Sequence, residues 1–425
     1  MKTQAAAIYG QNDVRLREFE LPPLGDDELL VKVISDSVCL STWKAAKLGA
    51  NHKRVPDNVA EHPAITGHEC AGIIEQVGKN LQQRYRAGQR FVLQPAMGLP
   101  SGYSAGYSYE YFGGNATYMI IPQQAVELGC VLPYEGSYFA AASLAEPMCC
   151  IIGAYHANYH TTQYVYEHRM GIKPGGNVAL LASAGPMGIG AIDYAINGNI
   201  RPARVVVVDI DEARLARARL LLPESVAREK GVELVYFNSS KAADPVAALR
   251  DLTQGHGFDD VFVYAAVADV LVLGDDLLAE DGCLNFFAGP TDSEFKVPFN
   301  FYNVHYASTH VVGTSGGSTG DMLEALQLTA EGRINPSVMI THIGGLDAVP
   351  ETIINLPSIP GGKKLIYNFA TMPLTAITDF PELGKTDPFY ARLAELVAES
   401  TACGTNRPSV SCCNILAWKQ GYNCR

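Results

Sequence analysis

Six short apolar runs in the middle of the chain, separated by helical patterns, constrain its fold most strongly. They begin after Gly175 and are rich in valine, leucine and phenylalanine. The runs are Val178–Leu181, Val205–Val208, Leu234–Phe237, Val261–Tyr264, Leu284–Phe287 and Val311–Gly313. Strands that alternate with helices form a parallel sheet with right-handed crossovers, because each crossover must pack back onto the sheet. The pattern predicts an α/β fold with a doubly wound, six-stranded parallel sheet.

The segments on either side of this sheet differ from it. A chain of 425 residues exceeds what one core usually organises, so two domains are expected. Residues 1–150 are β-rich, with β-branched runs at Leu29–Ile34 and Ala71–Val77 that are bounded by Gly, Pro and Asp. After residue 320 come a helical pattern over Met322–Ala330 and a strand ending in Lys364–Tyr367. A first domain interrupted by the sheet, with a substrate cleft between the two domains, is the expected arrangement.

Composition excludes several classes of protein. The formal net charge of −12 argues against nucleic acid or an anionic membrane as the main partner. No apolar segment reaches the roughly 20 residues that span a bilayer, and no apolar run follows a basic N-terminal stretch. The ten cysteines are scattered and form no disulfide framework. We expect a soluble, cytoplasmic protein.

A glycine-containing turn follows the first apolar run. It reads Ser183-Ala184-Gly185-Pro186-Met187-Gly188 and lies between a strand and a helix, as a dinucleotide-binding turn does. Gly185 lets the backbone approach a pyrophosphate, and Gly188 allows the helix to pack closely on the strand. The helix that begins near Pro186 and Met187 offers free N–H groups to the phosphates. Ser183 stands where a glycine is usual, which weakens the match.

An acidic residue ends the second apolar run. Asp209 lies about 20 residues beyond the turn, where a carboxylate accepts hydrogen bonds from the adenosine ribose and repels a 2′-phosphate. It favours NAD(H) over NADP(H). Arg214, one turn into the next helix, leaves NADP(H) use open. The alternative interpretation is that Asp209 only caps that helix.

Four side chains upstream of the turn match the ligands of a catalytic zinc ion. Cys39 offers a thiolate, His68 an imidazole, and Glu69 and Glu146 offer carboxylates. Taken singly, a cysteine in a strand is usually a small buried hydrophobe, and a histidine is more often a core residue than a ligand. The joint pattern favours a metal site, and a Lewis acid beside a nicotinamide indicates alcohol–carbonyl hydride transfer.

Over residues 1–370 the chain resembles the zinc-containing medium-chain dehydrogenases/reductases. The motifs that carry the resemblance are Cys39-Leu40-Ser41-Thr42, Gly67-His68-Glu69, Gly113–Tyr118, Glu146-Pro147, the Ser183–Gly188 turn and Asp209. The resemblance implies a GroES-like β-rich catalytic domain joined to a Rossmann domain. It also implies one catalytic zinc, with Cys39 and His68 as ligands and with Glu69 and Glu146 completing the shell.

Further roles follow from the same resemblance. Ser41 matches the proton-relay hydroxyl, and Lys44 stands where relatives often place a relay histidine; with Glu69 they are the predicted catalytic residues. The stretch that holds a second, structural zinc in many members, Gln94–Gly114, has no cysteine here and is rich in tyrosine. That tyrosine run is interpreted as a domain cover, a subunit contact or a packed surface loop. A homo-oligomer is expected.

These features divide the chain into four segments. Residues 1–155 form the first part of the catalytic domain, residues 156–315 the dinucleotide-binding domain, and residues 316–370 the return to the catalytic domain. Residues 371–425 form a C-terminal extension. A helix is predicted from Thr386-Asp387-Pro388, and a poorly ordered end after Ser400. His156 and His160 are four residues apart and could share a helix face; without an evident acidic or cysteine partner, they are interpreted as cleft-lining or structural residues.

The substrate is the least constrained property. A basic stretch follows the first ligand and indicates an anionic substrate, although a solvated basic loop has the same pattern; it contains Lys44, Lys47, His52, Lys53 and Arg54. The resemblance implies reduction of a sugar phosphate, L-sorbose 1-phosphate, to D-glucitol 6-phosphate. The alternatives are an unphosphorylated polyol such as sorbitol and, from another class, a non-catalytic dinucleotide-binding protein.

Overall fold

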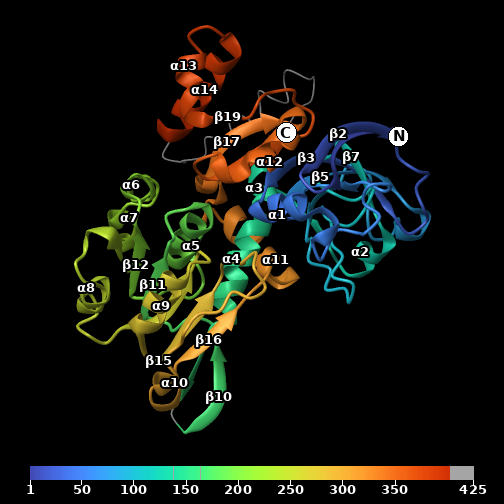
Figure 1. The fold of residues 1–425 in the computed structure, drawn as a ribbon. Helices are drawn as coiled ribbons and strands as arrows, with labels where there is room; N and C mark the ends of the chain where they lie inside the picture. Colours follow the sequence, from blue (N-terminus) through green and yellow to red (C-terminus); the bar gives the residue numbers. More distant parts are fainter. Residues whose placement is uncertain (137, 163, 403–425) are drawn as a thin grey trace. The chain divides into compact units, whose positions relative to one another are not determined.

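The computed structural model describes residues 1–136, 138–162 and 164–402, shown in Figure 1. The chain divides into two compact units, of which the first comprises Met1–Pro147 and the chain from Pro336 onward, and the second Met148–Asn335. The boundaries expected after residues 155 and 315 both lie inside the second unit. Helix α4 (Ala145–Ala157) is continuous past the first of them, and helix α11 (Thr319–Ala330) follows the second.

The second unit contains the predicted parallel sheet. Its strand order is β13-β12-β11-β14-β15-β16, and neighbouring strands are parallel. The strands are β11 (Asn177–Leu181), β12 (Arg204–Asp209), β13 (Glu233–Asn238), β14 (Phe258–Val263), β15 (Leu278–Phe286) and β16 (His310–Gly313). Each contains or overlaps one of the six apolar runs, so the doubly wound α/β fold is confirmed. The strand order reverses beside β11, which makes the end of β11 the switch point of the sheet.

Helices connect these strands. They are α5 (Pro186–Asn197), α6 (Glu212–Leu221), α7 (Glu224–Glu229), α8 (Pro245–Asp251), α9 (Ala268–Leu277) and α10 (Phe301–Tyr306). Leu181, Val208 and Val261 are buried in the core between the sheet and its helices. The runs Val178–Leu181 and Val205–Val208 are buried along their whole length, which explains why the sequence showed them as continuous apolar runs.

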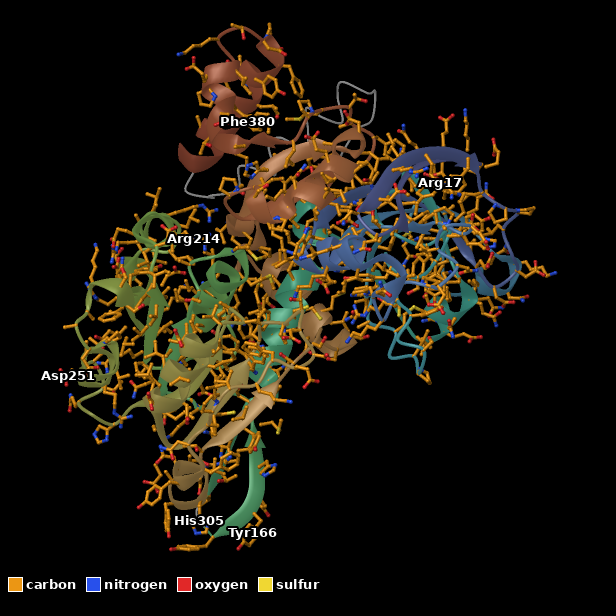
Figure 2. The ribbon with its side chains drawn as sticks, viewed as in Figure 1. Arg17, Tyr166, Arg214, Asp251, His305 and Phe380 are labelled. Carbon is orange, nitrogen blue, oxygen red and sulfur yellow. The ribbon has the colours of Figure 1, made fainter. Side chains whose placement is uncertain are left out.

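An antiparallel hairpin of strands β9 (Tyr159–Thr162) and β10 (Val165–Met170) extends from the second unit. Tyr166 on this hairpin is 96% exposed and is labelled in Figure 2. His156 and His160 do not share a helix face, because α4 ends at Ala157 and His160 lies on β9. Both histidines also have acidic partners that are distant in sequence: Asp321 for His156 and Asp260 for His160.

The first unit is β-rich, as predicted. One sheet has the order β19-β17-β18-β3-β5-β6-β8, with β7 also paired to β3, and a smaller sheet has the order β2-β1-β4. The strands are β1 (Lys2–Gly10), β2 (Asp13–Glu20), β3 (Leu29–Val38), β4 (Ala64–Ile65), β5 (Cys70–Val77), β6 (Arg90–Leu93), β7 (Tyr118–Ile121), β8 (Val131–Pro133), β17 (Ile340–Gly345), β18 (Lys363–Tyr367) and β19 (Thr375–Ala376). The antiparallel pairing of β18 with β3 returns the end of the chain to the first unit.

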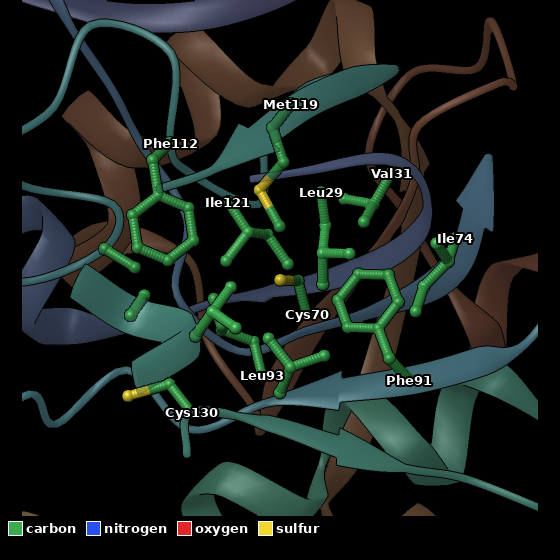
Figure 3. Close-up of a cluster of buried hydrophobic side chains, with 14 of the residues drawn as sticks. Leu29, Val31, Cys70, Ile74, Phe91, Leu93, Phe112, Met119, Ile121 and Cys130 are labelled. Atoms are coloured by element: carbon green, nitrogen blue, oxygen red, sulfur yellow. The ribbon is translucent and has the colours of Figure 1, made fainter. Parts of the chain in front are cut away.

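The main core of the first unit lies against one face of its larger sheet (Figure 3). Leu29 and Val31 project into it from β3 at the two-residue period of a strand, and Phe91, Met119 and Ile121 project from β6 and β7. This core fixes the register of β3 against β5, and the ends of those two strands carry the candidate ligands.

Short helices complete the first unit. They are α1 (Leu40–Leu48), α2 (Gln123–Glu127), α3 (Phe139–Ser143), α12 (Val349–Asn355), α13 (Phe380–Leu383) and α14 (Pro388–Ala402). Helix α14 begins at Pro388, as the sequence predicts. The expected poorly ordered end lies largely outside the described residues. No described helix is long and apolar enough to cross a membrane.

Candidate active site

The candidate ligands meet where two antiparallel strands adjoin. Cys39 directly follows β3 and precedes α1, whereas His68 and Glu69 directly precede β5. Because β3 and β5 run in opposite directions, with Asp36 opposite Cys70, the end of one lies beside the start of the other. One ligand atom each from Cys39, His68 and Glu69 lies within 4.8 Å of the others.

Glycines hold the backbone in front of His68. Gly67 has φ +86°, and a Cβ atom there would lie 2.5 Å from the Asn115 nitrogen. A Cβ on Gly106 would lie 2.2 Å from the Gly67 oxygen, which also accepts a hydrogen bond of 2.7 Å from the Gly114 nitrogen. Side chains at these positions would force the backbones apart and displace His68.

A buried ion pair that the sequence did not predict neutralises Glu69. Lys363 lies at the start of β18, and its ammonium contacts the Glu69 carboxylate, which also accepts a hydrogen bond from the Ser37 hydroxyl. Lys363 is 5% exposed and Glu69 is 1% exposed. Burial opposes the charge of Lys363, but Glu69, Cys39 and Glu146 together outweigh burial and raise the lysine pKa. The two residues are 294 positions apart in the sequence, so no local sequence pattern could predict their pairing.

The protonation states suit metal binding. Burial lowers the pKa of His68 to about 4, which leaves a neutral imidazole able to coordinate a metal. Burial also raises the pKa of Cys39 to about 11, so metal binding must displace a proton from the thiol. Asp36 is fully buried beside this group, and burial raises its pKa well above the usual range.

Two hydroxyl groups adjoin the candidate ligands. Ser41 donates to the Cys39 sulfur at 3.0 Å, and its Oγ lies 3.4 Å from His68 Nε2. Tyr107 donates to Ser41 Oγ at 2.8 Å, and its hydroxyl lies 3.3 Å from the same histidine nitrogen. Tyr107 is 1% exposed. It belongs to the tyrosine run that was interpreted as a cover, a contact or a surface loop, and its role here was missed. The only sequence signal for this role was the glycine that precedes it, Gly106, which packs against the backbone of Gly67.

The remaining predicted residues of this site lie around the three ligands. Glu146, in the first turn of α4, is not in the three-residue group, but its charge contributes to raising the pKa of Cys39. Lys44 is partly buried on α1, and burial lowers its pKa while Cys39 opposes that shift. Both are therefore near enough to act electrostatically on the candidate ligands.

The dinucleotide turn of the second unit lies at the switch point of its sheet. Gly185 caps α5, whose first residues are Pro186 and Met187, and a Cβ on Gly185 would meet no atom within 4 Å. A Cβ on Gly188 would instead lie 1.8 Å from the Ser183 oxygen. Gly185 thus leaves room for a ligand, and Gly188 permits close packing of helix and strand.

Asp209 ends β12 and faces this turn. Its Oδ2 accepts a hydrogen bond of 3.0 Å from the Ala184 nitrogen, and its Oδ1 accepts from Ile210 at 2.8 Å. The helix cap is Asp211, which accepts from the Ala213 and Arg214 nitrogens, so the capping alternative for Asp209 is wrong. The Arg214 side chain is 61% exposed beside Asp211 and is labelled in Figure 2.

The residues of the first unit fit a zinc ion. They combine one thiol, one imidazole and one carboxylate in a largely buried group, with a second carboxylate nearby. This is the donor set of zinc rather than of magnesium or calcium. Sequence comparison agrees. Residues 25–129 match the alcohol dehydrogenase GroES-like domain, and residues 186–331 match the zinc-binding dehydrogenase domain. The chain belongs to the zinc-binding dehydrogenase family.

Two relatives of this zinc-binding dehydrogenase align over nearly the whole chain. The mannitol-1-phosphate 5-dehydrogenase of Aliivibrio fischeri is 66% identical over 94% of each chain. The L-sorbose 1-phosphate reductase of Klebsiella pneumoniae is 45% identical over 90% of this chain and 92% of its own. Among solved structures, a zinc-binding dehydrogenase from Sinorhizobium meliloti bound to NADP has a TM-score of 0.70, at 20% identity over 87% of this chain and 100% of that chain. The last likeness shows the fold alone.

Proposed function

We propose that this zinc-binding dehydrogenase transfers hydride between a nicotinamide coenzyme and a sugar phosphate, in the reaction that interconverts L-sorbose 1-phosphate and D-glucitol 6-phosphate. The observation that carries the proposal is the pairing of the Cys39–His68–Glu69 group with two extensively aligned relatives named for sugar phosphates. The 66% identical relative makes mannitol 1-phosphate the second candidate substrate. Asp209 supports NAD(H) as the preferred coenzyme, with NADP(H) as the alternative.

Different residues of the first unit would bind the zinc ion and accept the substrate proton. Cys39 and His68, with Glu69 and Glu146, would hold the zinc ion. When bound, zinc polarises a carbonyl or lowers the pKa of an alcohol. Ser41 is placed to receive the hydroxyl proton of the substrate, and the 2.8 Å hydrogen bond from Tyr107 orients it.

Lys363 and Lys44 supply the positive charge in this proposal. Lys363 forms a buried ion pair with the Glu69 carboxylate and so offsets its negative charge. The partly buried ammonium of Lys44, whose pKa is lowered by burial, is proposed as a proton relay or an anion contact. The two lysines place positive charge at the proposed site, although the net charge of the chain is −12. Positive charge there favours the binding of an anionic sugar phosphate.

Two further properties belong to the proposal. The exposed aromatic rings of the β9–β10 hairpin and of α10 support a homo-oligomer, because large exposed apolar patches usually mark interfaces. The most exposed are Tyr164, Tyr166, Phe301, Tyr302 and Tyr306. The described cysteines form no disulfide bond with one another, which supports the reducing cytoplasm as the location. Light scattering during size-exclusion chromatography and cell fractionation test these two points.

A substrate panel tests the catalytic proposal. Purified protein, with its zinc content measured by elemental analysis, is assayed through the absorbance of NADH and NADPH. The substrates are L-sorbose 1-phosphate, D-glucitol 6-phosphate, mannitol 1-phosphate and the corresponding unphosphorylated sugars. We expect turnover of the phosphorylated compounds and a fall of about a hundredfold in kcat for Ser41→Ala with zinc retained. Equal turnover of sorbitol would support the polyol alternative. Zinc-free protein that added zinc does not activate would support a non-catalytic role.

A further inference from the structure

Arg54 occupies a defined place beside the candidate active site. Its guanidinium carbon lies 5.1 Å from the centroid of the Tyr107 ring, whose hydroxyl contacts Ser41 and His68. The backbone of Arg54 is also fixed, because Ser108 Oγ donates to its carbonyl oxygen at 2.6 Å. Stacking on an almost fully buried ring restricts the side chain, so less entropy is lost when it binds a ligand.

The guanidinium has no acidic partner among the residues that the structure describes. Other arginines do: Arg17 pairs with Glu110, and Arg204 pairs with Glu233. A partly buried guanidinium without a carboxylate partner keeps its planar set of donors available for an anion.

The positive charge of Arg54 helps to lower the pKa of two nearby histidines, His52 and His68. Burial lowers the pKa of His52 to about 4, and Arg54 adds to that shift; His52 stacks on the Tyr107 ring with centroids 5.9 Å apart. Burial likewise lowers the pKa of His68, and Arg54 is one of the charges that lower it further. The neutral His52 therefore does not compete with Arg54 for an anion.

We propose that Arg54, supported by the ring of Tyr107, binds the phosphate group of the substrate and sets the preference for phosphorylated over unphosphorylated sugars. This inference rests on the proposed function. Tyr107 joins the two parts of the site: its hydroxyl orients Ser41 at the reacting carbon, and its ring face supports the phosphate-binding guanidinium. Arginine binds phosphate through two parallel hydrogen bonds, which lysine does not reproduce.

Four variants test the assignment: Arg54→Gln, Arg54→Lys, Tyr107→Phe and the control Lys53→Gln. Lys53 is the exposed neighbour, and its substitution removes the same charge. For Arg54→Gln we expect KM for L-sorbose 1-phosphate to rise about ten- to a hundredfold, with kcat/KM for L-sorbose unchanged. Arg54→Lys should show an intermediate KM. Tyr107→Phe keeps the ring, so it should lower kcat and leave KM for the phosphorylated substrate unchanged. Lys53→Gln should change KM by less than about twofold.

A direct binding measurement separates phosphate recognition from folding. Inorganic phosphate should inhibit the wild type competitively, and Arg54→Gln should lose this inhibition while keeping its zinc content and thermal unfolding midpoint. If the wild type turns over phosphorylated sugars and Arg54→Gln has the same KM for them, the assignment is wrong and the proposed function stands. A rise in KM that is equal for phosphorylated and unphosphorylated sugars also overturns it. If the wild type prefers unphosphorylated polyols, the proposed function itself fails, and the inference fails with it.

Discussion

The ligand group of the first unit comes from separate segments, whereas the dinucleotide turn of the second unit is one continuous stretch. Cys39, His68–Glu69 and Lys363 meet only because β3 pairs with β5 and β18. The turn Ser183–Gly188 needs only a strand, a tight bend and a helix start. The first region depends on buried charges and the second on the absence of side chains. The two should therefore respond to different kinds of substitution.

The largest expected effect concerns the buried charges of the first unit. Lys363→Met leaves the Glu69 carboxylate buried without its cation, which should lower the free energy of unfolding by about 3–5 kcal/mol. Urea-induced unfolding of chelator-treated protein, followed by circular dichroism, measures this loss. The double variant Lys363→Met/Glu69→Gln removes both charges and should recover most of it. A single variant as stable as the wild type would contradict the role of this pair.

The second expected effect concerns shape in the turn. Gly188→Ala places a methyl group against the Ser183 carbonyl, so we expect a loss of about 1–3 kcal/mol in stability and weaker NADH binding. Gly185→Ala is the matched control, because its methyl group meets no protein atom and should reduce NADH binding while sparing stability. Thermal unfolding and fluorescence titration with NADH measure the two properties. Equal loss of stability in both variants would show that sterics do not distinguish these glycines.

The third expected effect concerns the charge of Asp209 beside the dinucleotide turn. Asp209→Asn keeps an oxygen to accept from the Ala184 nitrogen but removes the charge that repels a 2′-phosphate. We expect the ratio of kcat/KM for NADPH to that for NADH to rise about tenfold, which corresponds to about 1.4 kcal/mol. Asp211→Asn removes an equal charge two residues away, and asparagine also caps helices well. Asp211→Asn should leave the ratio of kcat/KM for NADPH to that for NADH unchanged. An equal change of this ratio in both variants would mean that only the net charge of the protein affects coenzyme preference.

The smallest expected effect is a pH dependence in the second unit. His160 is 4% exposed; burial opposes its charge, but Asp260, with Asp281 nearby, outweighs burial and raises the histidine pKa above 6.5. This contribution to stability is complete below the unfolded-state pKa and is lost as the pH rises through the folded-state pKa.

Urea midpoints measured from about pH 6 to about pH 9 should therefore fall with rising pH. His160→Gln should flatten this slope, and substitution of the exposed His305 by glutamine should not. A slope that survives His160→Gln would assign the pH dependence to another group.

The sequence predicted those features that depend on residues close together in the chain, and it missed those that depend on distant residues. The six strands were predicted because each contains a short apolar run. The run Val205–Val208 is buried on both faces, whereas the edge strands β13 and β16 are only partly buried. The turn was predicted because its glycines are close together in the chain. The hairpin of β9 and β10 was not predicted, since the exposed stretch Val165–Met170 has no buried face and therefore no periodicity.

The site shows the same division. Cys39, His68 and Glu69 were found by residue type and order, and their convergence follows from strand pairing. Tyr107 was missed because a tyrosine in a glycine-rich loop has the same local sequence whether it faces solvent or a metal site. Lys363 was missed because nothing in its neighbourhood indicates a carboxylate from the far end of the chain.

The sequence alone determined the α/β class, the second unit's sheet and the chemical identity of the candidate ligands, because apolar periodicity, glycine spacing and donor type are local properties. The tertiary structure alone decided which charges face each other: it set Lys363 against Glu69 and stacked Arg54 on Tyr107. Electrostatic pairing depends on distances in space, and those are fixed only when the strands have taken their register.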